Sequence, residues 1–353
     1  MRARRCALAT AALAIAVFGL AGRAARADDL VRSIGASNPA AFYEVLEHVA
    51  ERAGFYKAEH LEVTKQFAGS PSACAQFVAT GKGDVCTMSI EPLIFGYDKG
   101  LRLQMIFAHD PHYTYVLGVL DESPIRTFAD FKDKVIGEIN AASEFSSEIS
   151  ANDMLAGAGL KRGDYTFAPI GVGAQALAAL TNKKVDGASF PAVELGQMGI
   201  LGHAGFRIFR DPILDSIPDL GFTASRTTIE TRGDVLKRYL RAIVMAAVLV
   251  RENPRLAARY FLEGIGRPVT PDALATETSL LVALRGDLAG ADPASKKIGA
   301  VPLAEIALYT KFFAERGLTA HVVPAGEIAT DRFIDYANDF DRKAFIATVK
   351  QMR

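Results

Sequence analysis

The feature that most constrains the fold is a strand, turn, helix and strand pattern that occurs twice. In the first copy, residues 67–92 (FAGSPSACAQFVATGKGDVCTMSIEP) read as a strand end, a glycine turn, a helix and a second strand. A related segment follows 102 residues later, where Gly171 corresponds to Gly69 and Asp186 corresponds to Asp84. Two matched βαβ units predict an α/β protein with two lobes.

The turns in these units predict where a ligand binds. A chain that leaves a strand through glycine and then enters a helix exposes unpaired backbone N–H groups, with the positive end of the helix dipole behind them. In open parallel sheets such turns lie at the carboxyl ends of the strands, where ligand crevices form. We therefore expect two facing crevices that close on a small polar solute.

Residues 1–27 are predicted to be a cleaved signal peptide. Three arginines within the first five residues precede an apolar run to about residue 21, and Ala-Arg-Ala at 25–27 is typical of a cleavage site. The alternative is an uncleaved anchor, but the run is short for a membrane span of ~20 residues. We expect a mature chain that begins at Asp28 and is located in the periplasm.

The charge balance argues against several classes of partner. The whole chain has 40 basic and 40 acidic residues, and residues 1–27 hold five arginines and no acid, which leaves the mature chain at −5. A negative net charge disfavours nucleic acid and anionic membrane surfaces as partners. No second segment is apolar over the length that a membrane span needs. We therefore expect a soluble chain, and a monomer.

Two cysteines follow the signal peptide. Cys74 lies in the predicted helix of the first repeat and Cys86 in the strand after it. An oxidising compartment permits a disulfide, but a helix that packs on its own βαβ sheet usually holds the two Cα atoms too far apart. We therefore expect two buried free thiols.

Polar and aromatic side chains gather where predicted strands end and helices begin. A Ser, Asn or Glu at such a place either caps or favours the helix start, or binds a ligand. Serines, Asn38 and backbone amides would bind an oxyanion, the glutamates would bind an amine, and the aromatic residues would form walls. The candidate ligand-binding residues are Ser37, Asn38, Ser70, Ser72, Ser89, Glu91, Tyr113, Ser143, Ser146, Phe190 and Glu194.

Metal, cofactor and catalytic motifs are not expected to operate here. Pro111 keeps His109 and His112 off a shared helical face, and no further His or Cys lies at ligand spacing. Residues 171–176 match G-x-G-x-x-A, but the acidic residue that a dinucleotide site needs about 20 residues on is missing. The sequence also lacks G-x-S-x-G and H-E-x-x-H. We predict no cofactor, no metal and no enzymatic activity.

Several segments in order carry a family likeness: AERAGFYKAEHLEVTKQFAG, FVATGKGDVCTMSIEPLIFGYDKG, FADFKDKVIGEINAASE, DMLAGAGLKRGDYTFAPIG, LTNKKVDGASF and LRAIVMAAVLVRENPRLAARYF. Over about residues 30–265 the chain resembles the periplasmic solute-binding proteins of ABC importers for nitrate, sulfonates and thiamine-pyrimidine precursors. The resemblance implies a two-lobed type II periplasmic binding protein fold with two crossover strands, in which residues 28–113 and 221–353 form lobe I and residues 114–220 form lobe II. It also implies hinge closure on a small solute and delivery to ABC permease subunits in the inner membrane.

The resemblance leaves the ligand open. The family's glycine-rich turn is the sparser Ala68-Gly69-Ser70-Pro71-Ser72 here, where hydroxyls and amides suit an organic acid or a sulfonate-like anion. We favour such an anion. The alternative is a pyrimidine or amine-bearing thiamine precursor, bound by Glu91 and Glu194. Two further alternatives are an enzyme of the pyrimidine-synthase type and a protein that presents its ligand to a membrane sensor.

Overall fold

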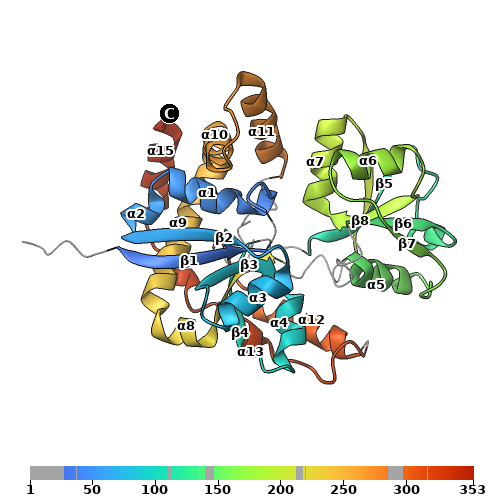
Figure 1. The fold of residues 1–353 in the computed structure, drawn as a ribbon, viewed down its shortest axis with the longest axis horizontal. Coiled ribbons are helices and arrows are strands. Elements are labelled where there is room, and N and C mark those ends of the chain that lie inside the picture. Colours follow the sequence, from blue (N-terminus) through green and yellow to red (C-terminus); the bar gives the residue numbers. More distant parts are fainter. Residues whose placement is uncertain are drawn as a thin grey trace, which may run out of the picture.

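The computed structural model of the chain describes residues 28–36, 38–109, 113–139, 147–211, 218, 220–284, 297–315 and 317–353. It has two α/β lobes that lie side by side along the long axis (Figure 1). The predicted fold class, α/β with two lobes, is confirmed. The strands that were predicted to cross between the lobes each lie within one of the two sheets. The predicted signal peptide at residues 1–27 lies outside the described residues. Among the helices that are described, none is both long and apolar enough to cross a membrane.

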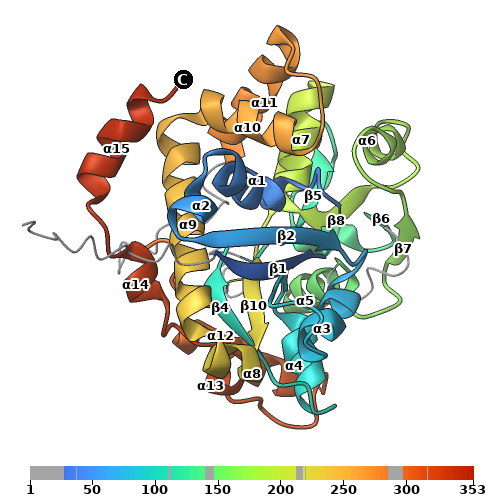
Figure 2. The same ribbon diagram turned by 60° about the vertical axis from the view of Figure 1, so that its left-hand side comes forward.

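Lobe I is built on a five-stranded sheet in the order β2-β1-β3-β10-β4. Strands β1, β2 and β3 run parallel, and β10 is antiparallel to both of its neighbours. Helix α9 lies along this sheet and packs on α1, α2, β1 and β2 (Figure 2). The strands are β1 (Asp29–Gly35), β2 (Leu61–Phe67), β3 (Val85–Ser89), β4 (Leu103–Ala108) and β10 (Leu220–Ser225).

Lobe II repeats this arrangement with the order β7-β6-β8-β5-β9, in which β5 is the antiparallel strand. The chain passes from lobe I to lobe II between β4 and β5 and returns between β9 and β10. The elements are β5 (Tyr115–Leu120), η2 (Phe128–Phe131), β6 (Val135–Glu138), α5 (Ile149–Gly157), β7 (Thr166–Pro169), α6 (Ala174–Thr181), β8 (Gly187–Pro191), α7 (Ala192–Gly202) and β9 (Phe206–Phe209).

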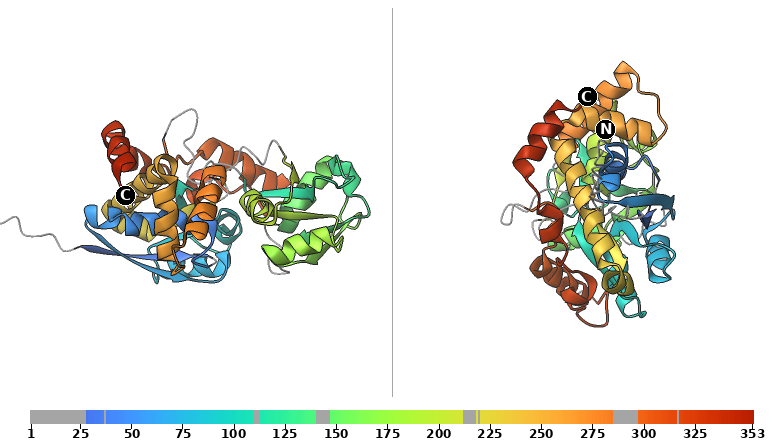
Figure 3. Two further views of the ribbon diagram at one scale, coloured as in Figure 1. Left: turned by 90° about the horizontal axis from the view of Figure 1, so that it is seen from above. Right: turned by 90° about the vertical axis from the view of Figure 1, so that its left-hand side faces the viewer.

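The remaining helices belong to lobe I, and those after β10 lie mostly on its side of the molecule, as the view from above shows (Figure 3), while α11 also contacts α7 of lobe II. α9 has a continuous apolar face whose side chains are buried against the sheet and α1. The helices are η1 (Phe42–Glu44), α1 (Val45–Arg52), α2 (Phe55–Ala58), α3 (Pro71–Ala79), α4 (Glu91–Tyr97), α8 (Arg226–Thr231), α9 (Gly233–Glu252), α10 (Pro254–Gly264), α11 (Pro271–Leu284), α12 (Leu303–Glu315), α13 (Ala325–Ile328), α14 (Ile334–Asn338) and α15 (Arg342–Gln351).

Asp84 and Asp186, the aspartates of the two repeats, have the same structural role in both lobes. Asp84 precedes β3, and its Oδ2 accepts the backbone N–H of Arg32 in β1 at 2.8 Å, while its own N–H donates to the Arg32 carbonyl at 2.8 Å. Asp186 precedes β8 and makes the same pair of bonds to Val135 at 2.9 and 2.8 Å. Each Asp therefore holds the start of one strand against its parallel neighbour.

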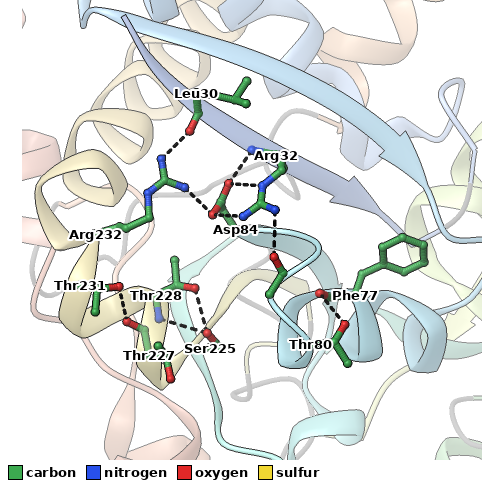
Figure 4. Close-up of polar contacts among 11 residues, drawn as sticks. Leu30, Arg32, Phe77, Thr80, Asp84, Ser225, Thr227, Thr228, Thr231 and Arg232 are labelled. Carbon is green, nitrogen blue, oxygen red and sulfur yellow. Dashed lines mark hydrogen bonds and ion pairs between the residues drawn. The ribbon is translucent and has the colours of Figure 1, made fainter.

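Lobe I adds two guanidinium groups to this motif. The Arg32 side chain donates to both oxygens of Asp84 at 3.1 and 3.0 Å, and Arg232 binds Asp84 and the Leu30 carbonyl (Figure 4). Burial raises the pKa of Asp84, but the hydrogen bonds from Arg32 and Arg232 outweigh it and lower that pKa overall. The junction of α8 and α9 is thereby tied to β1.

We expect Asp84→Ala to lower the free energy of unfolding by ~2–3 kcal/mol, because it leaves a strand N–H and two guanidiniums without their acceptor. Asp186→Ala is the matched control, and it should cost ~1 kcal/mol because only the strand N–H loses its partner. Because the pKa of Asp84 is lowered, its contribution is present above its ordinary value and is lost as the pH falls. Urea unfolding of both variants at pH 7 measures the difference, and equal losses would contradict the role of the arginines.

Cys74 and Cys86 form a disulfide, so the prediction of two free thiols is wrong. Helix α3 packs directly on β3, which brings the two Cα atoms to 6.0 Å, within the range that a disulfide spans. The sequence argument overestimated this separation because it treated the helix as standing off its own sheet. The bond joins the helix and the strand of the first repeat.

We expect the double substitution of Cys74→Ser and Cys86→Ser to lower the free energy of unfolding by ~2 kcal/mol. The bond links two cysteines that are 12 residues apart in sequence. Without it the unfolded chain has more conformational entropy, which favours unfolding. Thermal unfolding with and without a reductant measures the effect. The variant should be insensitive to the reductant, and a reductant-insensitive wild-type protein with free thiols by mass spectrometry would contradict the bond.

Candidate functional site

A cavity of about 560 Å³ lies between the lobes and takes its walls from both. From lobe I it is lined by Ala36, Asn38, Ala40, Ala41, Phe42, Tyr43, Gly69, Pro71, Thr87, Met88, Ser89 and Leu220, with Thr114 and Tyr115 at the crossing. From lobe II it is lined by Ile139, Val172, Gly173, Ala174, Leu177, Pro191, Val193, Glu194, Gln197, Met198, Leu201 and Gly202.

The lobe I wall forms where three neighbouring parallel strands end. β1 is followed by Asn38, whose side-chain oxygen accepts the N–H of Ala40 at 3.0 Å and shapes the turn into η1. β2 is followed by Gly69, whose φ of +81° favours glycine, and by the start of α3. β3 ends at Ser89 in the cavity wall. Strand ends in parallel sheets thus supply this wall, as expected.

The lobe II wall is largely one face of α7. Glu194, Gln197, Met198 and Leu201 all line the cavity, and their spacing of three, four and seven residues places them on one side of a helix. The turn at 172–174, which opens α6, completes the wall. A mostly apolar surface with a few polar atoms is typical of a site for a small organic molecule.

Glu194 is the only ionisable carboxylate, and no Lys, Arg or His stands beside it, among the described residues that line the cavity. Its Oε2 is shielded from solvent and has no hydrogen-bond partner among the described residues. Burial raises the pKa of Glu194 to about 7. A carboxyl group in this state binds a hydrogen-bond donor strongly and disfavours a ligand of its own charge.

Thr87 supplies a second polar atom without a partner, from the opposite lobe. Its hydroxyl is buried in the middle of β3 and makes no hydrogen bond within the described part of the chain. Buried polar groups are normally satisfied, and within the described residues Thr87 and Glu194 each keep a polar atom that a ligand could bind.

The predicted site residues fall into three groups. Asn38, Ser89 and Glu194 line the cavity. Ser143, Ser146 and Ser37 lie outside the described residues. The others lie in the described part of the chain but not in the cavity wall: Ser70, Ser72, Glu91, Tyr113 and Phe190.

Each residue of the last group has a local structural role or environment. Ser70 caps α3 by accepting the N–H of Ala73 at 3.2 Å, and Ser72 is exposed on that helix. Phe190 is fully buried in the apolar core of lobe II, because its side chain points to the other face of β8 from the cavity. Glu91 and Tyr113 are hydrogen-bonded to each other at 3.1 Å, and both are buried.

Sequence reasoning missed several lining residues. Gln197 follows Glu194 by three residues, a helical spacing that would have indicated it. Thr87 lies two residues before Ser89 in β3, and alternation along a strand places both side chains on the same face. Tyr43 carried no pattern that separates it from ordinary core or surface tyrosines.

A buried charge cluster supports the wall formed by Phe42 and Tyr43. Lys65 in β2 binds the carboxylates of Glu44 in η1 and Glu47 in α1, and both carboxylates are shielded from solvent. Glu47 also accepts hydrogen bonds at 2.5 Å from the hydroxyls of Ser33 and Tyr239. This cluster, called the Lys65 cluster below, ties η1 to β1, β2 and α9 directly behind the cavity.

Within the Lys65 cluster the pKa values of the two carboxyl groups shift in opposite directions. Burial raises the pKa of Glu47, but Lys65, Ser33 and Tyr239 outweigh it and lower that pKa to about 2. Burial and the neighbouring Glu47 raise the pKa of Glu44 to about 7 against the pull of Lys65. Glu47 is therefore the ionised partner of Lys65, and Glu44 holds a proton through part of the neutral range.

Two lobes of matching strand order, two crossings and a cavity between them define the periplasmic binding protein fold. The family described as NMT1/THI5 like matches residues 43–257, and the chain belongs to this family. No curated protein matches the chain in a sequence comparison.

Solved structures show the same fold. The aliphatic sulphonate binding protein SsuA from Escherichia coli is similar with a TM-score of 0.65 at 19% identity, over 85% of this chain and 92% of that one. SsuA from Xanthomonas axonopodis pv. citri, bound to MOPS, is similar with a TM-score of 0.60 at 18% identity, over 87% and 100%. The desulfurization enzyme DSZB, as a mutant with biphenyl-2-sulfinic acid, is similar with a TM-score of 0.57 at 17% identity, over 88% and 98%.

Proposed function

We propose that this chain is the extracytoplasmic solute-binding component of an ABC importer, which captures a small organic solute between its lobes by hinge closure. Its family, its two-lobed fold and a cavity lined from both lobes support this role. Binding proteins of this fold, the two SsuA proteins, are among the similar structures. Closure on the solute would exclude water and strengthen the polar contacts.

We further propose that the solute has an apolar body and an N–H donor, as an amine, amidine or aminopyrimidine has, rather than the organic anion favoured from the sequence. The observation that carries this is the buried Glu194 carboxyl group with an unpartnered oxygen and no cationic side chain beside it in the described wall. An ammonium or amidinium would pair with an ionised Glu194, whereas a sulfonate would meet a like charge or a neutral acid.

The remaining wall suits the apolar body. Phe42, Tyr43, Met88, Tyr115 and Met198 surround the cavity from both lobes. Aromatic rings and methionine side chains pack well on a flat ring, and the aromatic rings also favour a cation near their faces. A planar ligand of modest size with an N–H donor, either neutral or with one positive charge, fits both the volume and the chemistry.

A thermal-shift screen with ligands of matched shape tests the proposal. Benzamidine and 4-aminopyrimidine are compared with benzoate and benzenesulfonate, each at rising concentration, on the purified protein at pH 8. A ligand at 100 times its Kd stabilises the folded state by about 2.7 kcal/mol, a rise of a few degrees in Tm. We expect a shift with the first pair only. A shift with the anions alone would support the sulfonate prediction and reject the role of Glu194.

The enzyme alternative has one supporting observation, the shared fold with the enzyme DSZB. Hydroxyl groups of Thr87, Ser89 and Thr114 line the cavity, without a Cys or His in the described wall. Mass spectrometry of a ligand recovered after long incubation with the protein distinguishes the two functions. A binding protein returns its ligand unchanged, and an enzyme does not.

A further inference from the structure

A buried hydrogen-bond network joins the two lobes behind the cavity. Its centre is the hydroxyl of Tyr113, in the segment that leads from β4 to β5. This hydroxyl lies 3.1 Å from Oε1 of Glu91, at the start of α4 in lobe I, and 2.7 Å from Oγ of Ser150, in α5 of lobe II. From α12, Tyr309 donates to the same oxygen of Glu91 at 3.1 Å. All four side chains are at most 2% exposed.

The chemistry of these groups assigns the direction of the bonds. Tyr113 donates to Oε1 of Glu91, and because its hydroxyl has a single proton, Ser150 then donates to Tyr113. The single hydroxyl of Tyr113 therefore has one partner in each lobe. Its ring also packs against Tyr309, edge to face, with centroids 5.7 Å apart.

Residues close in sequence to Tyr113 and to Glu91 line the cavity. Thr114 and Tyr115, which follow Tyr113 in the chain, line the cavity, and so does Ser89, two residues before Glu91. A rotation of lobe II about this segment would move the α7 wall relative to the strand ends of lobe I. The hydrogen bonds of Tyr113 to Glu91 and Ser150 therefore depend on how far apart the two cavity walls lie.

We propose that Tyr113 is a positioning residue for ligand binding, which holds the lobes at the separation at which both walls contact one ligand. The proposal rests on the proposed function for its binding readout, and on the hydrogen-bond network alone for its structural readout. Tyr113→Phe removes the hydroxyl and keeps the ring. Ser150→Ala removes the lobe II partner. Tyr309→Phe is the matched control, because the bond from Tyr309 to Glu91 stays within lobe I.

Lobe separation is measured by pulsed electron paramagnetic resonance on spin labels at Glu62→Cys in lobe I and Lys184→Cys in lobe II, both exposed positions. We expect Tyr113→Phe and Ser150→Ala to broaden or shift the distance distribution of the ligand-free protein, and Tyr309→Phe to leave it as in the parent. Unchanged distributions in Tyr113→Phe would overturn the proposal. Equal broadening in all three variants would also overturn it, because the effect would then come from Glu91 and not from the link between the lobes.

Binding of benzamidine supplies the second readout. The loss of one interlobe hydrogen bond should weaken its Kd roughly five- to tenfold in Tyr113→Phe and Ser150→Ala, and at most about twofold in Tyr309→Phe. Thermal unfolding confirms that each variant is folded. If benzamidine binds none of the proteins, the parent included, the proposed ligand class fails, while the distance measurement still decides the role of Tyr113.

Discussion

Glu194→Gln is expected to weaken benzamidine binding by ~100-fold or more, because it removes the carboxylate that pairs with the amidinium in a cavity of low polarity. A charge-assisted hydrogen bond to a buried partner is worth ~2–4 kcal/mol, which corresponds to this change in Kd. Isothermal titration calorimetry at pH 8 measures it. Gln197→Ala is the matched control, one turn further along the same face of α7, and it should change Kd by less than about tenfold.

The pH dependence gives an independent test of the same residue. Benzamidine stays cationic across the neutral range, so its affinity should follow the ionisation of Glu194, whose pKa burial raises to about 7. Kd should be constant above that pKa and rise about tenfold for each pH unit below it. In Glu194→Gln this dependence should vanish. A Kd that is independent of pH in the parent protein would contradict the role of Glu194.

The same raised pKa affects the stability of the ligand-free protein. Because the folded pKa of Glu194 lies above its ordinary value of 4.5, the folded state binds more protons between these two values. Its contribution to stability is therefore fully present below about pH 4.5 and is lost as the pH rises through 7. We expect Glu194→Gln to be more stable than the parent by ~1–3 kcal/mol at pH 8 and similar to it at pH 4.

Lys65→Met is expected to lower the free energy of unfolding by ~3–5 kcal/mol at pH 8, the largest stability loss that we predict. It leaves the carboxylates of Glu44 and Glu47 buried without their cation, and breaking a buried ion pair from one side costs this much. Because the Lys65 cluster supports the wall at Phe42 and Tyr43, the variant should also bind benzamidine more weakly. Urea unfolding and calorimetry measure the two effects.

The two acids of the Lys65 cluster provide matched controls. Glu47→Gln should cost ~2–3 kcal/mol at pH 7, since Lys65 then loses its ionised partner, whereas Glu44→Gln should cost less than ~1 kcal/mol. In Lys65→Met the cation no longer opposes burial, so the pKa values of both carboxyls rise, although Ser33 and Tyr239 still donate to Glu47. Because the pKa of Glu47 in the parent is about 2, the ion pair still exists at pH 4, so the stability loss should persist there and grow as the pH rises to 8. A loss that is equal at both pH values would contradict the ionic origin.

The two-lobed fold was predictable because its signal is repeated and local. Gly69 and Gly171 both adopt positive φ, at +81° and +71°, and the aspartates of both repeats bond to the neighbouring strand in the same way. Such features depend on a few residues within one βαβ unit. The disulfide was not predictable in this manner, because it depends on how closely α3 packs on β3, a distance that the sequence does not state.

The candidate site was predictable only in part, for reasons of helix register. The sequence argument paired Glu91 with Glu194, but the repeat places Glu91 opposite Val193. A shift of one residue turns a side chain by about 100° around a helix, so Glu91 and Glu194 are not equivalent. Glu91 bonds to Tyr113 and Tyr309, whereas Glu194 lines the cavity. Phe190 and Pro191 show the strand equivalent, because a shift of one residue moves a side chain to the opposite face.

The position of β10 has a consequence for how the chain is assembled. β10 lies between β3 and β4 and is hydrogen-bonded to both, although all the strands of lobe II come between β4 and β10 in the sequence. Until residues 220–225 have been synthesised, β4 has no neighbour in its sheet, whereas every strand of lobe II is contained within residues 115–209. A chain that emerges from its amino end can thus complete lobe II first, and lobe I closes only when the late strand inserts into its centre.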